Sequence, residues 1–218
     1  MIVAVLKPKG PTSHDVIDEI RLITGEQKVG HAGTLDPLAS GVLVVGIGRE
    51  ATKKLNEIVQ KEKEYIASVR LGVTSTTDDE EGLKHEVEVK EIPEDKKISL
   101  SVRRFVGSIN QTPPVYSAVK VGGQESYKRA RRGEEVKLRP RAVEIKEIEI
   151  LEYKWPILKL RVVTGPGVYI RSLARDIGAS LGVGGYLAKL ERTRVGEFTK
   201  EKAISMENLK INLSKTRF

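Results

Sequence analysis

The apolar residues of this chain recur with two different periods, which together predict both strands and helices. Residues 64–72 (EYIASVRLG) carry apolar side chains at every second position, the period of a strand with one buried face. The alternating side chains are Tyr65, Ala67, Val69 and Leu71. The apolar run VLVVGIG instead indicates a buried strand. The strands predicted on these grounds are residues 2–6, 42–48, 64–72, 142–153 and 157–165, the last two turning at Pro156.

Helical spacing of apolar residues marks four further segments. The clearest is residues 10–25, where Thr12 and Asp15 form a capping-box pattern and Gly25 ends the apolar repeat. Helices are predicted within residues 10–25, 50–60, 94–107 and 165–182, the last after a Gly-Pro-Gly break. Because strands and helices mix without a regular βαβ alternation, the predicted fold class is α+β rather than doubly wound.

Two polar or proline-containing segments are predicted to be irregular. Residues 110–123 contain two prolines, which indicates extended or looped backbone. Residues 74–82 (TSTTDDEEG) form a polar turn or loop, whose acids are either solvated or part of a cation site. The spacing of these acids does not match an EF-hand loop, so the solvated loop is the favoured interpretation.

The composition excludes several classes of protein. A chain of 218 residues suffices for one large domain or two small ones. The absence of cysteine excludes disulfides, thiol catalysis and cysteine-ligated metals, and it is consistent with a reducing compartment. No apolar run reaches the length of a membrane span, and residues 1–6 are too short for the core of a signal peptide. We therefore expect a soluble, cytoplasmic protein with no membrane partner.

The charge of the chain points toward an anionic partner. Lys and Arg number 38 against 30 Asp and Glu, which leaves a formal net charge of +8. Residues 127–141 (YKRARRGEEVKLRPR) concentrate cations around one tyrosine. Such a run is often only a solvated helix face, and abundant Glu and Lys also occur on thermophile surfaces. Clustered arginine beside glycine turns favours contact with the phosphates of a nucleic acid.

One carboxylate lies in an otherwise nearly apolar, glycine-rich stretch, GHAGTLDPLASGVL, at residues 30–43. Asp36 precedes a proline, as in a turn or a helix N-cap with Pro37 at the first helical position. The alternative is a reactive carboxylate on a shaped loop. The chain has no Walker A, GxGxxG, HExxH or GxSxG motif and no zinc spacing. A carboxylate nucleophile suits an anomeric carbon, with a nearby cation to keep it ionised and an aromatic ring to stack on a base.

These residues closely resemble the TruB family of tRNA pseudouridine synthases, which modify the T-loop uridine at tRNA position 55. The GH-x-GTLDPLASG stretch is the most specific part of the resemblance. The matching segments, in the order typical of the family, are residues 7–16 (KPKGPTSHDV), 28–54, 62–82, 112–136 and 167–198. The resemblance implies a pseudouridine-synthase fold, with a mixed, mainly antiparallel sheet, flanking helices and a central active-site cleft.

The resemblance also assigns roles to individual residues. Asp36 matches the catalytic aspartate, Tyr65 the aromatic residue that stacks on the flipped uracil, and Arg171 the cation that pairs with the catalytic carboxylate. The expected substrate contacts are His31 near the flipped nucleotide and Tyr169 and Leu190 at the uracil pocket. Taken singly, these are an ordinary loop histidine, strand or core tyrosines, a core leucine and a helix-surface arginine. Residues 122–141 match the thumb segment that grips the T-arm, and its candidate RNA-binding cations are Lys128, Arg129, Arg131 and Arg132.

The resemblance further implies no cofactor, no metal and no obligatory protein partner, with tRNA as the substrate. We expect one catalytic domain over residues 1–218, without the C-terminal PUA-type RNA-binding domain of many relatives. Glu191 stands where relatives commonly have arginine. Asp36 either adds to C1′ or removes a proton at C2′. Two rival hypotheses are a guide-RNA-dependent enzyme of the same superfamily, which generally lacks the segment 122–136, and a non-catalytic RNA-binding or tRNA-folding protein.

Overall fold

The computed structural model describes the backbone of residues 1–215 and the side chains of residues 1–210. Its contacts divide the chain into two compact units. Unit 1 consists of residues 1–66 together with the chain from residue 190 onward, and unit 2 of residues 67–189. Because the contacts form two clusters, the single catalytic domain expected for residues 1–218 stays a prediction.

Unit 1 is built on paired strands from both the N-terminal and the C-terminal part of the chain. Strand β1 pairs antiparallel with β3, from Ile2 opposite Gly46 to Lys7 opposite Gly41. Strand β3 also pairs antiparallel with β2 and parallel with β12, and β14 lies parallel to β1. The strands are β1 (Ile2–Lys7), β2 (Val29–His31), β3 (Ala39–Ile47), the start of β4 (Lys63–Leu71), the end of β12 (Gly185–Val195), β13 (Phe198–Thr199) and β14 (Ile204–Ser205). The helices are α1 (Ser13–Thr24), α2 (Arg49–Val59), the short 3-10 helix η1 (Lys200–Lys202) and α6 (Met206–Lys215).

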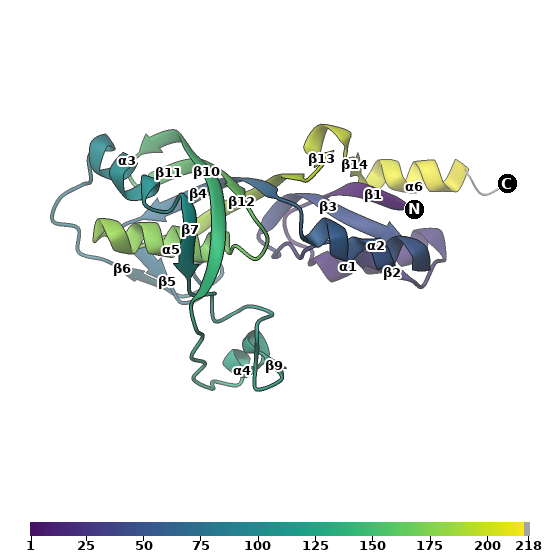
Figure 1. Ribbon diagram of the computed structural model, residues 1–218, viewed down its shortest axis with the longest axis horizontal. Coiled ribbons are helices and arrows are strands. Elements are labelled where there is room, and N and C mark those ends of the chain that lie inside the picture. Colours follow the sequence, from purple (N-terminus) through teal and green to yellow (C-terminus); the bar gives the residue numbers. More distant parts are fainter. Residues whose placement is uncertain (216–218) are drawn as a thin grey trace. The chain divides into compact units, whose positions relative to one another are not determined.

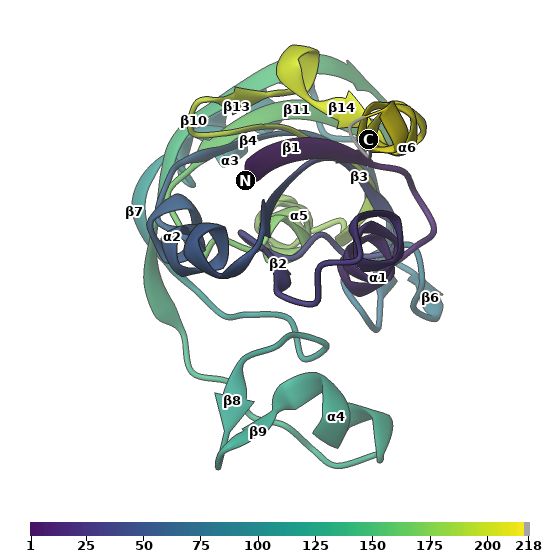
Figure 2. The same ribbon diagram turned by 90° about the vertical axis from the view of Figure 1, so that its right-hand side faces the viewer.

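Strands β1 and β3 are buried on both faces, which explains their continuous apolar sequences. One face, with Leu43 and Val45, packs against α1 and against Leu209 of α6. The other face, with Val42 and Val44, packs against α2. Figure 2 shows α1 and α2 on opposite sides of β2. The predicted strand 42–48 is therefore confirmed, although it begins earlier, at Ala39.

Helix α1 has the ends that its sequence predicts. The Thr12 hydroxyl accepts a hydrogen bond from the Asp15 amide at 3.0 Å, and the Asp15 carboxylate accepts one from the Thr12 amide at 2.7 Å. This reciprocal pair satisfies two amides that the helix itself leaves without partners. Gly25 follows the helix in the left-handed conformation, with φ 72°. The predicted capping box and the predicted stop are both confirmed.

Unit 2 contains an antiparallel group of strands with helices beside it (Figure 1). The strand order there is β4-β11-β10-β7, and the pair β10–β11 confirms the predicted hairpin around Pro156. Its elements are β5 (Val73–Ser75), β6 (Lys84–Glu86), α3 (Asp95–Arg103), β7 (Gly107–Gln111), β8 (Lys120–Val121), β9 (Gln124–Glu125), α4 (Ser126–Arg131), β10 (Arg141–Lys154), β11 (Ile157–Thr164) and α5 (Ile170–Leu181). Figure 1 shows β9 and α4 projecting from the ends of β7 and β10, and Figure 2 shows β8 beside β9.

The helix predicted at residues 94–107 is wrong at its C-terminal end. Helix α3 ends at Arg103, and residues 107–111 form strand β7, which pairs antiparallel with β10. Gly107 has φ 98°, a conformation that ends the helical path at low steric cost. In the described part of the chain, no helix has the length and apolar character needed to cross a membrane.

Helix α5 packs closely against the chain that follows it. The amides of Val183 and Gly184 both donate to the carbonyl of Gly178, at 3.1 Å each. A Cβ atom at Gly178 would overlap the backbone of Gly184 and Gly185, so glycine is required there. This close approach sets where β12 begins.

We predict that Gly178→Ala lowers the free energy of unfolding by about 2 kcal/mol or more, because the added methyl group has no room without backbone movement. The matched control is Ala179→Ser, at the next and exposed helix position, where the cost is only about 0.5 kcal/mol from helix propensity. Urea unfolding of the two variants measures the difference. Equal stability of both would contradict the close packing.

Candidate active site

Asp36 lies on the connection between β2 and β3, in a tight turn. Its carbonyl accepts a hydrogen bond from the Ala39 amide at 3.0 Å, and β3 begins at Ala39. Pro37 therefore occupies the second position of a β-turn, where proline is favoured. No helix follows Asp36, so the helix N-cap alternative is excluded and the turn alternative holds for the backbone. The Asp36 side chain is half-buried.

The Asp36 turn is held by residues from the KPKGPTSHDV segment. The buried Ser13 hydroxyl donates to the Leu35 carbonyl at 2.9 Å and accepts from the Leu35 amide at 2.8 Å. The Gly10 amide donates to the Pro37 carbonyl at 2.8 Å. The two most recognisable segments of the sequence thus form one rigid structure, with hydrogen bonds on both sides of Asp36.

Two buried lysines belong to the same unit, and one of them, Lys7, is near enough to Asp36 for their charges to interact. Lys7 is 1% exposed and donates from Nζ to the carbonyls of Pro8 and Pro11, at 2.9 and 2.7 Å. Burial lowers the pKa of Lys7, while the negative charge of Asp36 opposes that shift. Lys63 is also buried, and burial together with the nearby charge of Arg192 lowers its pKa to about 8. The positive charges of this region favour an ionised carboxylate in their neighbourhood.

His31 sits at the end of β2, with its ring edge-on to His14 at 5.9 Å between centroids. Burial, with smaller contributions from the charges of His14 and Arg192, lowers the pKa of His31 to about 4. Within the described residues, its buried Nδ1 has no hydrogen-bond partner. His31 is therefore neutral at pH 7 and retains hydrogen-bonding capacity.

Tyr65 and Leu190 belong to the two strands that link the units. Tyr65 is 7% exposed and alternates with the other buried residues of β4, as its sequence predicts. Leu190 is buried and pairs with Ala39 in the β12–β3 ladder, so it lies next to the Asp36 turn. Glu191, the next residue on β12, pairs with Lys200 at 2.6 Å.

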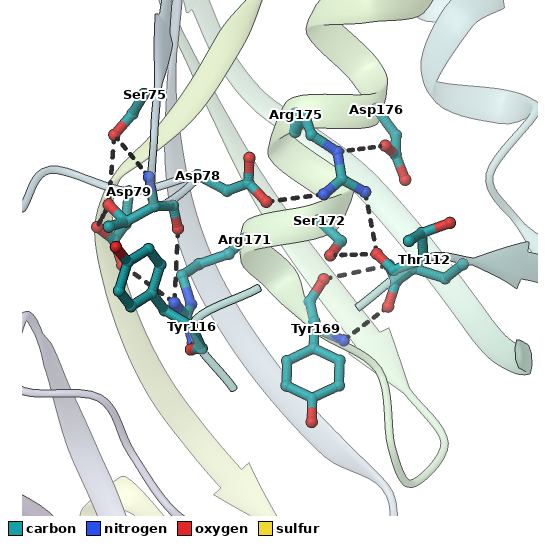
Figure 3. Close-up of polar contacts among 12 residues, drawn as sticks. Ser75, Asp78, Asp79, Thr112, Tyr116, Tyr169, Arg171, Ser172, Arg175 and Asp176 are labelled. Carbon is teal, nitrogen blue, oxygen red and sulfur yellow. Dashed lines mark hydrogen bonds and ion pairs between the residues drawn. The ribbon is translucent and has the colours of Figure 1, made fainter. Parts of the chain in front are cut away.

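Arg171, in the first turn of α5, is not the helix-surface arginine of the simplest interpretation. It is 7% exposed, and its Nη1 lies 3.4 Å from Asp79 Oδ2 (Figure 3). Its Nη2 donates to the Tyr116 carbonyl at 3.0 Å. Asp79 is itself held by the Thr77 hydroxyl and the Glu81 amide. These contacts fix the direction of the Arg171 side chain within unit 2.

The interpretation of residues 74–82 as a solvated loop holds for the exposed Glu80 and Glu81 but is wrong for the other two acids, Asp78 and Asp79. Asp79 is 3% exposed and pairs with Arg171, while Asp78 pairs with Arg175 at 2.7 Å. Burial raises the pKa of Asp78, and the positive charge of Arg175 opposes this shift. The one signal in the sequence that could have indicated this arrangement is the presence of two adjacent acids in the loop and of two arginines four residues apart on α5. Sequence reasoning missed both aspartates.

Gln111 is a second residue that sequence reasoning missed. It is 2% exposed and lies at the end of β7. Its side-chain amide accepts from the Tyr169 amide at 2.8 Å and donates to the Tyr169 carbonyl at 3.1 Å. The carbonyl of the next residue, Thr112, accepts from Ser172 and Arg175 (Figure 3). The chain is thereby fixed at the point where Tyr169 precedes α5.

The predicted RNA-binding cations lie on α4 and at its C-terminal end, and most have an acidic neighbour. Arg129 and Arg132 both donate to Glu134, at 2.6 and 2.8 Å. Lys128 pairs with Glu125 at 3.1 Å. Arg131 is exposed and lies 5.6 Å from the centre of the Tyr127 ring.

Helix α4 is anchored at its first residue. The fully buried Ser126 hydroxyl lies 2.7 and 2.8 Å from the carbonyl oxygens of Val115 and Ser117. The Tyr127 amide donates to the Ser117 carbonyl at 3.1 Å. The cations therefore stand on a short helix tied to the segment that also supplies the Tyr116 carbonyl to Arg171.

The predicted site residues fall into two groups. Unit 1 holds Asp36, His31, Tyr65 and Leu190, and unit 2 holds Tyr169, Arg171 and the cations of α4. Each group is fixed by hydrogen bonds within its own unit. Among the residues that the structure describes, no three His, Asp or Glu side chains gather to ligate a metal ion.

The comparison with protein families agrees with the resemblance noted in the sequence. The model of the TruB family pseudouridylate synthase N-terminal domain matches residues 21–170. The chain belongs to the TruB family. A model of the tRNA pseudouridylate synthase B C-terminal domain matches residues 171–216. The boundary between these matches falls just before Arg171.

Individual TruB relatives are similar over most of the chain. A tRNA pseudouridine synthase B of Thermobifida fusca is 46% identical over 95% of this chain and 73% of its own length. The enzyme of the same name from Corynebacterium diphtheriae is 45% identical over 97% of this chain and 72% of its own. A Parabacteroides distasonis relative, also so named, is 46% identical over 93% of this chain and 88% of its own.

Solved structures support the pseudouridine-synthase fold. A chain of a Cbf5-Nop10-Gar1 complex superposes with a TM-score of 0.75 at 35% identity. A chain of an archaeal box H/ACA sRNP Nop10-Cbf5 complex does so with a TM-score of 0.71 at 31% identity. Both matches cover at least 96% of this chain but only 53% of the other, so the chain spans about half the length of these solved chains. The predicted α+β fold is confirmed.

We predict that the ring of His31 titrates with a midpoint of about 4, because burial disfavours its charged form. Its folded pKa lies below the ordinary 6.5, so the unfolded chain binds the proton first. The stability contributed by His31 therefore falls as the pH decreases from about 6.5 to about 4. NMR of the labelled ring measures the midpoint, with His31→Asn to assign the signal. A midpoint near 6.5 would contradict the burial argument.

Proposed function

We propose that this protein isomerises uridine to pseudouridine in the T-loop of tRNA, with Asp36 as the group that reacts at the sugar. Membership of the TruB family supports the reaction, and the names of the close relatives support tRNA as the substrate. The observation that carries the assignment of Asp36 is its position on a turn held by Ser13, Gly10 and its own Ala39 hydrogen bond. Such support keeps a reacting carboxylate in one place.

The reaction breaks the N1–C1′ bond, rotates the uracil and forms a C5–C1′ bond, after which the C5 proton is lost and N1 is protonated. It needs no oxidant, reductant or energy donor, because substrate and product are isomers. Asp36 either adds to C1′ and is later released, or removes a proton at C2′. Both routes require an ionised carboxylate, and the positive charge of the nearby buried Lys7 favours that form.

In this proposal residues of both groups act on the same uridine. Arg171 stabilises the charged Asp36 carboxylate, while its ion pair with Asp79 limits the directions that the guanidinium takes. Tyr65 stacks on the everted uracil and takes part in the late transfer of the C5 proton. Tyr169 and Leu190 line the uracil pocket. An everted base presents its face to aromatic and apolar side chains in this way.

The cations of α4 supply contacts to the RNA backbone. Phosphate contacts are sequence-independent and salt-dependent, so they position a folded stem-loop without reading it. Because Glu134 holds Arg129 and Arg132 in place, the proposed grip is oriented as well as charged. His31 adds a neutral contact near the reacting nucleotide.

A second candidate function is guide-RNA-dependent pseudouridine formation. The observation that favours it is the superposition on chains from box H/ACA assemblies. The greater similarity to stand-alone relatives, at 46% against 35% identity, favours the tRNA enzyme. A bare T-arm hairpin with no added protein or guide RNA separates the two, because only the stand-alone enzyme modifies it.

We expect that the purified protein forms pseudouridine in an unmodified tRNA transcript, and that a transcript with cytidine at the T-loop position stays unmodified. Asp36→Asn removes the reacting charge and abolishes the modification while the Kd for tRNA changes by less than about twofold. Chemical mapping of pseudouridine and a binding titration measure the two effects.

Asp18→Asn, an exposed carboxylate on α1, is the matched control and keeps full activity. Turnover of Asp36→Asn close to that of the parent would reject a reactive role. If the parent and Asp36→Asn improve tRNA folding equally, the protein has a chaperone activity in addition to its enzymatic activity.

We predict that replacing Arg129, Arg131 and Arg132 by glutamine weakens tRNA binding and reduces the slope of log Kd against log salt by about 2, because up to three phosphate contacts are lost. Replacing the exposed Lys96 and Arg103 of α3, and Arg104 just after it, by glutamine removes the same charge elsewhere and leaves the slope nearly unchanged. Fluorescence titrations at several salt concentrations test this. Identical slopes for the two triple variants would show that α4 does not contact the RNA.

A further inference from the structure

We propose that Arg192 is a positioning residue that closes the base of the loop carrying Asp36. This inference rests on the proposed role of Asp36. In the proposed arrangement, Arg192 does not touch the substrate and acts only through the loop backbone. Loss of its two hydrogen bonds to the loop backbone therefore lowers turnover without weakening the binding of tRNA.

The guanidinium of Arg192 joins the two ends of one loop. Its Nε donates to the Val42 carbonyl at 2.8 Å, and its Nη2 donates to the Gly33 carbonyl at 3.0 Å. Residues 33 and 42 bracket the segment that contains Asp36. Because the guanidinium is planar and rigid, these two hydrogen bonds fix the separation of the loop ends. A lysine ammonium is a single point and does not reproduce the fork.

Arg192 differs from its neighbours on β12 in what it binds. Glu191 pairs with Lys200 and Arg194 pairs with Glu62, so both are engaged in ion pairs. Among the described residues, the side chain of Arg192 contacts carbonyl oxygens instead, and it is 1% exposed. Burying a cation without a carboxylate is costly, and an apolar residue would serve a purely structural strand better.

The backbone around Arg192 is shaped to accept it. Gly41 lies opposite Arg192 in the β3–β12 ladder with φ 107°, and a Cβ there would overlap the Arg192 carbonyl. Gly33 has φ 92°, a conformation that favours glycine, and a Cβ there would be in ordinary contact with Arg192 Nη1, at 3.5 Å. Both glycines flank the Asp36 turn. The two glycines and Arg192 thus lie together where the two ends of the Asp36 loop meet.

The loop is held from two directions. Ser13 and Gly10 bind its tip at Leu35 and Pro37, and Arg192 binds its base. A reacting group must be placed to within about 0.5 Å for efficient catalysis. Release of the base leaves the tip attached to α1 but lets the Asp36 turn shift relative to β3.

The test compares Arg192→Lys and Arg192→Met with Arg194→Met. Arg194 lies two residues along on the same strand but is bound to Glu62. We expect kcat to fall by at least about tenfold in both Arg192 variants, with the tRNA Kd within about twofold of the parent. Hydrogen exchange of the peptide covering residues 33–42 increases in the Arg192 variants and not in Arg194→Met, which keeps its kcat.

Each outcome bears on the proposal. An unchanged kcat in folded Arg192→Lys, with only a lower melting temperature, would make Arg192 purely structural and overturn it. A weakened tRNA Kd at unchanged kcat would make it a binding residue and also overturn it. If Arg192→Met does not fold, Arg192→Lys retains the charge and carries the test. If the parent forms no pseudouridine, the proposed function fails, while the exchange of residues 33–42 still decides whether Arg192 closes the loop.

Discussion

Strand β3 is buried on both faces, and the predicted site residues of unit 1 depend on it. Its register with β1 is fixed because a shift by one residue would exchange the side chains that face α1 with those that face α2. The same strand pairs with β2, which ends at His31, and with β12, which places Leu190 opposite Ala39. The Asp36 turn is the entry to this strand. A buried core strand thereby determines the position of the half-buried Asp36 carboxylate.

Unit 2 faces a different physical problem, which is the burial of charge. Helix α5 carries the buried Arg171 and the partly buried Arg175, and a guanidinium removed from water needs a partner. The loop after β5 supplies one acid to each arginine. Asp78 accepts a left-handed backbone, with φ 61°, as part of this arrangement. The orientation of Arg171 is therefore decided by a loop almost a hundred residues away in sequence, and the helix only presents it.

Several elements could be predicted because their signals are local. The capping box and Gly25 mark both ends of α1, and the alternation of Tyr65 with its neighbours marks β4. The hairpin of β10 and β11 follows from two apolar repeats around a proline. Strand β7 was missed because its short polar sequence, GSINQ, carries no alternation of apolar residues, and its pairing with β10 stabilises the extended form. Propensity is a weak guide where tertiary contacts decide.

By itself, the sequence determined the family, the α+β fold class and the identity of the reactive candidate, because these depend on residue types and spacings within short segments. Only the tertiary structure decided which charged residues are buried and what they hold. Asp79, Gln111 and Arg192 look like ordinary polar residues in the sequence, yet each binds a backbone or side chain far along the chain. The physical reason is that burial and hydrogen bonding depend on distant partners, which a local pattern does not contain.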